Sequence, residues 1–88
     1  MLRITRIEIE KGITTLRLEG RVTEQELETL YKAVAECLHE NRRLVVDLSK
    51  VLFVNLAGAA AIRDLQERGI VLEGCSPFVS ELLKECSR

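Results

Sequence analysis

A short apolar run from Leu44 to Leu48 sets the frame for the rest of the chain. Its residues, Leu-Val-Val-Asp-Leu, do not alternate between apolar and polar types. Such a run is typical of a strand buried on both faces, in the middle of a sheet with helices packed against it. We therefore expect a layered α/β architecture. With 88 residues the chain has room for one domain, residues 1–88, and no more.

The segments before this run predict two strands and a helix. Residues 2–9 and 13–19 have strand patterns, and a change of phase in the apolar residues indicates a bulge or kink near Thr5-Arg6. Thr23 is a good N-cap, and Glu26 three residues later completes a capping box. An apolar stripe at helical spacing follows, so we expect a helix from Thr23 onward.

The segments after the run continue the alternation of helix and strand. A helix is expected over Ala57–Arg68, with Gly69 as its C-cap, and a very short strand over Ile70–Leu72. Ser76-Pro77 opens a last helix, since serine caps well and proline suits the first helical position. The predicted order is β-β-α-β-α-β-α, an α/β fold with a small, mostly parallel sheet and helices packed on it.

The bulk properties exclude several classes of partner. A net charge of -1 gives no electrostatic basis for binding nucleic acid. The chain has no run of roughly 18 apolar residues for membrane insertion and no signal-peptide pattern at its start, so we expect a cytoplasmic protein. Cys37, Cys75 and Cys86 are an odd number without metal-type spacing. Buried thiols are therefore favoured over a metal or redox role.

The chain offers little that an enzyme would need. His39 is the only histidine and sits near the polar end of a helix, so no nucleophile and base can be paired around it. The glycines are isolated and form no phosphate-binding loop. Asp47 is either a Mg²⁺ ligand or a hydrogen-bonded carboxylate at the end of a strand, and without a second acidic residue at a suitable spacing the latter is favoured. We expect no catalysis, no metal and no cofactor.

Several segments together resemble the STAS domain, the fold of anti-sigma-factor antagonists. In that family a central strand ending in an Asp-Leu-Ser-like segment leads to a loop that reads phenylalanine, apolar residue, aspartate, serine, small residue and glycine. The second helix of the family begins at that loop. The segments that carry the resemblance are Leu18–Val22, Leu44–Ser49, Phe53–Gly58, Gly69–Leu72 and Ser76–Val79.

The resemblance implies a role in regulation through protein–protein contacts. STAS domains act as anti-sigma-factor antagonists, in stress-sensing complexes, as small subunits of lipid-transport ABC systems and as tails of anion transporters. In the switching members a kinase partner docks on the loop and the start of the second helix. It phosphorylates the serine or threonine just after the aspartate, and the added charge separates the complex.

This chain departs from the family pattern at the switch itself. Asn55 stands where aspartate is common, and Leu56 stands at the phosphoacceptor position. Leucine has no hydroxyl, so this position cannot be phosphorylated. Two interpretations of Leu56 remain open: an exposed apolar anchor for a partner, or a side chain turned into the domain's own core. The partner-binding residues expected from the resemblance are Asn55, Leu56, Ala57, Gly58, Ala59, Ile62 and Arg63.

Several functions are compatible with this reading. The first is binding to a protein partner such as a kinase-like anti-sigma factor, without the phosphorylation switch. The alternatives are the small subunit of a lipid-transport ABC complex and a module that senses a small ligand or a nucleotide. The edge strands of so small a sheet also allow a homodimer.

Overall fold

The computed structural model describes residues 2–10, 12–40 and 43–86, and it contains a four-stranded sheet. The first two strands form an antiparallel pair, and the third and fourth are added in parallel. Their order in the sheet follows their order in the chain: β1 (Leu2–Glu10), β2 (Ile13–Val22), β3 (Arg43–Val54) and β4 (Val71–Glu73). The sheet is therefore mostly parallel, as predicted.

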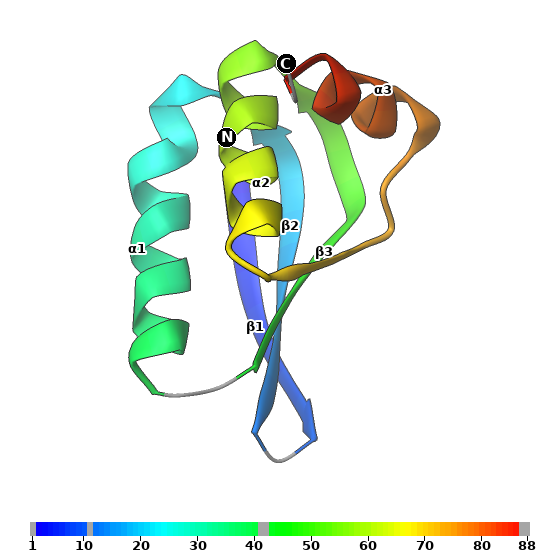
Figure 1. Cartoon of the computed structure of the whole chain (residues 1–88). Helices are drawn as coiled ribbons and strands as arrows, with labels where there is room; N and C mark the ends of the chain where they lie inside the picture. The colour runs from blue at the N-terminus through cyan, green and yellow to red at the C-terminus, as the bar shows by residue number, and fades with distance from the viewer. Residues whose placement is uncertain (1, 11, 41–42, 87–88) are drawn as a thin grey trace.

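The helical elements alternate with the strands after the opening hairpin. They are the 3-10 turn η1 (Glu24–Glu26) and the helices α1 (Leu27–His39), α2 (Leu56–Glu67) and α3 (Pro77–Cys86). In Figure 1, α2 crosses in front of the strands, with α1 on one side of it and α3 on the other. The predicted order β-β-α-β-α-β-α is confirmed.

The helices that the structure describes all pack on the same face of the sheet. Along β3, Leu44, Val46 and Leu48 are buried, whereas Val45 and Asp47 between them are only half-buried. The expectation that this strand is buried on both faces is therefore wrong. The apolar run lacked alternation because Val45 contributes an apolar side chain to the less covered face.

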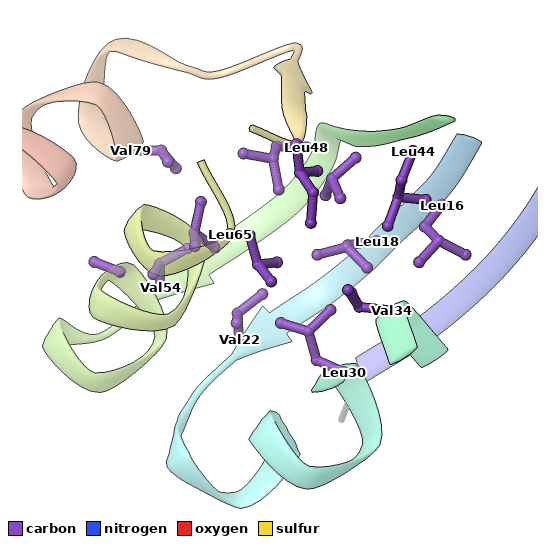
Figure 2. Packing of buried hydrophobic residues seen from close by; sticks show 14 of the residues in the cluster. Leu16, Leu18, Val22, Leu30, Val34, Leu44, Leu48, Val54, Leu65 and Val79 are labelled. Atoms are coloured by element: carbon purple, nitrogen blue, oxygen red, sulfur yellow. The ribbon is translucent and has the colours of Figure 1, made fainter. Parts of the chain in front are cut away.

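The buried face of the sheet and the inner faces of the helices form one core. Figure 2 shows how the side chains of the strands meet those of the helices. Leu18, Leu30, Ile62 and Leu65 each have 0% exposure in this cluster. The labelled core residues are Leu16, Leu18, Val22, Leu30, Val34, Leu44, Leu48, Val54, Leu65 and Val79.

The start of α1 differs from the predicted capping box. The Thr23 side chain makes no hydrogen bond to the backbone, and its hydroxyl lies 3.2 Å from Oε1 of Glu26 instead. The segment after Thr23 forms the turn η1 before the α-helix begins at Leu27. The sequence thus marked the right place for the chain to turn, but the two side chains bond to each other rather than to the main chain.

The bulge predicted near Thr5-Arg6 is also misplaced. Pairing of β1 with β2 runs without interruption from Leu2 to Ile7, and the irregularity lies between Ile7 and Glu10. The change of phase has another cause. Ile4 packs against the core, whereas Ile7 lies on the opposite face of the sheet.

The remaining helix boundaries follow the prediction closely. Gly69 follows the end of α2 with a φ of 91°, which a glycine adopts without strain. The Ser76 hydroxyl accepts a hydrogen bond from the Val79 amide at 3.2 Å and so caps α3. Cys37 is buried and Cys75 is half-buried; both remain thiols, and burial raises the pKa of Cys75. The side chain of Cys86 lies outside the described residues.

Candidate functional site

The candidate site is the corner where β3 ends and α2 begins, and Asn55 holds it together. Asn55 has an extended backbone, and its Oδ1 accepts a hydrogen bond from the Gly58 amide at 2.9 Å. Its Nδ2 donates to the carboxylate of Glu24 in η1. Both ends of the amide are therefore engaged, which fixes its orientation and caps α2 as expected for an asparagine at this position.

The bond from Asn55 also affects the electrostatics of η1. It is the largest cause holding the pKa of Glu24 below its ordinary value, and a backbone hydrogen bond within η1 acts in the same direction. Glu24 is therefore ionised at neutral pH, and its negative charge lies beside an amide that donates to it. The contact joins the turn before α1 to the start of α2.

Gly58 lets the start of α2 lie directly against the end of β2. A Cβ placed on Gly58 would lie 2.8 Å from the carbonyl carbon of Val22 and closer still to its oxygen. The main-chain amide of Asn55 donates to the same Val22 carbonyl at 3.4 Å. No larger residue fits here without moving the helix, so Gly58 has a structural role in positioning the corner.

Three large apolar side chains are exposed at this corner, and we call them the corner patch. Leu52 is 84% exposed, Phe53 is 39% exposed and Leu56 is 61% exposed. Leu52 and Phe53 directly precede Val54, the last residue of β3, and Leu56 is the first residue of α2. Leu56 is not part of the core, so the interpretation that its side chain turns into the domain's own core is wrong.

The other residues expected at the site divide into half-buried and buried ones. Ala57 is half-buried, and Arg63 is half-buried with its Nε 3.9 Å from Glu67. Ala59 and Ile62 have 0% exposure and pack in the core. The expectation that these two side chains contact a partner is therefore wrong, because they point from α2 toward the sheet.

A polar hollow of about 360 Å³ adjoins the corner patch. Arg21 and Phe53 form part of its wall, with the guanidinium 5.1 Å from the centroid of the ring, a cation–π distance. Its lining residues are Arg21, Thr23, Glu24, Gln25, Glu26, Phe53 and Asn55. Sequence reasoning did not place Leu52, Arg21 or Glu24 at the site. The one available signal was the pair of large apolar residues at 52 and 53 just before the loop.

Asp47 lies within β3 and not at the end of a strand as expected, because β3 continues to Val54, and neighbours within the chain hold its carboxylate. Its Oδ1 accepts from the Ser49 amide at 2.9 Å, and its Oδ2 lies 3.3 Å from Nε of Arg17. Hydrogen bonds from Ser49, then the Arg17 guanidinium, lower the pKa of Asp47. Over the described ranges no three His, Cys, Asp or Glu side chains gather as a metal site would require.

The histidine and the lengths of the helices bear on catalysis and on membrane insertion. His39 is exposed and is the last residue of α1. Of the helices that the structure describes, none is both long enough and apolar enough to cross a membrane.

The fold of this chain is similar to that of several solved structures. The unphosphorylated anti-sigma factor antagonist SpoIIAA matches with a TM-score of 0.68 and 12% identity, over 93% of this chain and 82% of that chain. An uncharacterised protein from Shewanella loihica PV-4 with a SpoIIAA-like fold matches with a TM-score of 0.61 and 12% identity, over 88% of this chain and 69% of that one. At these identities the likeness is one of fold.

A part of a longer protein also has this fold. Mglu matches with a TM-score of 0.62 and 22% identity over 83% of this chain, but the match covers only 19% of Mglu. No curated protein sequence matches the chain. The family described as "Mlab, STAS domain" matches residues 5–87. Because that match takes in nearly the whole chain, the protein belongs to the STAS domain family.

Proposed function

We propose that this STAS domain is a non-catalytic, cytoplasmic regulatory domain that binds a protein partner through the corner patch. The observation that supports this most is the position of Leu56. It is the first residue of a helix whose start is fixed by the Asn55 cap, and its side chain is 61% exposed. A fixed helix start presents this apolar side chain in one place, so a partner pays little entropy to order it.

The corner patch offers exposed apolar area that a partner could bury. Burying a leucine completely contributes about 1.5–3 kcal/mol, so Leu56 and Leu52 together have several kcal/mol available from area alone. The polar hollow that Phe53 of the patch helps to line offers charged groups, including Arg21 and Glu24. An apolar centre beside a polar rim is the usual arrangement of a protein–protein interface.

Leu56 also bears on how binding is regulated. Leucine accepts no phosphoryl group, so the complex is not dissociated by modification at this position. Binding to a kinase-like anti-sigma factor would then follow the abundance of the two proteins. The missing hydroxyl equally favours a partner that does not act on this position as a kinase, and the second candidate is therefore an ATPase of a lipid-transport ABC complex.

The test uses two leucine variants that differ only in place. The partner is first captured from native cytoplasm and identified, and its affinity for the purified domain is then measured by titration calorimetry. Leu56→Glu puts a charge in the corner patch, whereas Leu38→Glu changes a leucine that is 42% exposed near the end of α1. We expect Leu56→Glu to weaken binding at least about tenfold, equal to about 1.4 kcal/mol.

The control should leave binding unchanged, because α1 ends at the opposite end of the molecule from the start of α2 (Figure 1). Circular dichroism of both variants checks that they are folded. A folded Leu56→Glu variant with the affinity of the wild type contradicts the proposed docking site. The identity of the partner separates the two candidates, since one is a kinase-like protein and the other a transport ATPase.

A further inference from the structure

The face of the sheet opposite the core carries an organised pattern of its own. We call it the open face. The strand registers place Ile7 beside Thr15, Thr15 beside Val45, and Val45 beside Val71, so these four residues form one row across all four strands. Val71 is 55% exposed, and the other three are half-buried. The row has no polar group other than the Thr15 hydroxyl.

The apolar row borders a hollow. A depression of about 350 Å³ is lined by Val45 and Val71 of the row, together with Ile13, Arg43, Leu44 and Gly69. Val45 and Val71 are therefore bordered by space that the domain's own side chains leave open.

A charged row lies two residues further along the strands. It runs from Thr5 through Arg17 and Asp47 to Glu73, again one residue from each strand. The Arg17 guanidinium lies 3.3 Å from Asp47 at the middle of this row. Glu73 is exposed, and no ion pair joins it to another of the described residues. The positive group lies on β2 and the negative groups on β3 and β4.

We propose that the open face binds the open face of a second copy of this chain, around a two-fold axis that runs along the strands between β2 and β3. This rotation places β2 opposite β3 of the other copy, and β1 opposite β4. Thr15 then faces Val45, Ile7 faces Val71, and each pair occurs twice. Sheets packed in this way lie about 10 Å apart, with their strands within about 30° of each other.

Charge complementarity is what favours a second copy over another partner. The same rotation sets Arg17 of each copy opposite Asp47 of the other, so opposite charges face each other twice near the axis. The four charges form a closed set in which every neighbour is of opposite sign. An unrelated protein would need to present an apolar row and an opposed charge pair at the same spacing, whereas a second copy has them already.

The size of the open face sets the strength of this dimer. Four strands about 4.8 Å apart and five residues of about 3.3 Å each give a face of roughly 19 by 17 Å. With side-chain relief this corresponds to roughly 500 Å² of accessible surface per copy, at the lower limit for a specific interface. We therefore expect a reversible dimer with a micromolar or weaker dissociation constant. Leu56 is the first residue of α2, on the side of the sheet that the helices cover, so this side chain remains accessible in both copies of the dimer.

Sedimentation equilibrium from micromolar to millimolar protein tests the proposal. The average mass should rise with concentration from 10.0 kDa toward twice that value. Val71→Glu should remove this rise, since it puts a carboxylate into the apolar row at an exposed position. Thr15→Lys, next to the axis, is a second variant on a longer strand and should do the same. Leu38→Glu, on the helix side, should dimerise like the wild type.

Circular dichroism and thermal melting establish that each variant is folded, and one folded open-face variant is enough for the test. A wild type that remains at 10.0 kDa at millimolar concentration overturns the dimer. A dimer that survives in folded Val71→Glu or Thr15→Lys overturns its assignment to the open face and moves it elsewhere, for example to the edge of β1. None of these outcomes depends on whether the corner patch binds a partner.

Discussion

Gly58→Ala is the most informative single change, because it tests the contact that positions the corner patch. The methyl group would lie 2.8 Å from the Val22 carbonyl carbon and closer to its oxygen, while ordinary contact begins at 3.4 Å. The start of α2 would have to move by at least 0.6 Å, the difference between these two distances. The obstacle is main chain of β2, which cannot turn aside as a long side chain would.

One stabilising and two destabilising effects set the change in the free energy of unfolding. Alanine favours a helix over glycine by about 1 kcal/mol, which alone would stabilise the variant. Forcing an additional carbon into packed structure costs typically 1–3 kcal/mol and occasionally more. The displacement also weakens the Asn55 cap, whose bond ends on the amide of Gly58 itself. A cap of this kind contributes about 1 kcal/mol. We therefore expect Gly58→Ala to lower the free energy of unfolding by about 1–3 kcal/mol.

Urea unfolding followed by circular dichroism measures this change, read from the midpoint with the slope held equal. Ala60→Gly is the matched control, because Ala60 is exposed on the same helix. It should cost no more than about 1 kcal/mol, from helix propensity alone. If Gly58→Ala proves more stable than the wild type, the close contact with Val22 is not a constraint, and the reasoning about how the corner is held fails.

Three further predictions concern the same region and the core. Asn55→Ala removes the cap and should lower the free energy of urea unfolding by about 1 kcal/mol. Asn55→Asp keeps an acceptor but sets a second carboxylate against Glu24, so the stability that this variant loses should become smaller as the pH falls and one acid is protonated. In the wild type the pKa of Glu24 is lowered on folding. Glu24 therefore contributes to the free energy of unfolding above its unfolded pKa of about 4.5, and this contribution is lost as the pH falls through the folded pKa. Glu24→Gln should remove this part of the pH dependence of stability. Leu30→Ala, at a position with 0% exposure, should cost about 2–5 kcal/mol in thermal or urea unfolding, and a cost below 1 kcal/mol would contradict its place in the core.

Sequence reasoning reached the order of the elements because local signals marked their ends. Gly69 ends α2, and Ser76 begins α3, each through contacts within a few residues. Signals of this kind depend on short-range geometry, which the sequence displays directly. The same is true of Asn55, whose cap on Gly58 spans only three positions.

Long-range contacts decided the parts that sequence reasoning missed. Nothing near Leu44 indicates that the three helices share one face of the sheet, so an unpatterned apolar run was read as buried on both. Glu24 and Asn55 are 31 positions apart, and their bond exists only because β2 and β3 lie side by side in the same direction. The burial of Ala59 and Ile62 also depends on which side of α2 meets the sheet. The resemblance gives the partner-binding residues only by their position in the sequence and does not show this side.

An exposed leucine by itself says little, because folded proteins leave much apolar surface in water. The corner patch is different because folding does not require its members to be where they are. The start of α2 is satisfied by the Asn55 cap and by the fit of Gly58 against Val22, neither of which uses the Leu56 side chain. A serine at position 56 would keep the same helix start and expose less apolar surface. The two contacts that fix the helix start therefore do not account for a leucine at this position, whereas the proposed apolar contact with a partner would. Under the proposed function, the leucine in place of a hydroxyl residue and the exposure of its side chain would be two aspects of one departure from the family pattern, a docking site that phosphorylation at this position does not release.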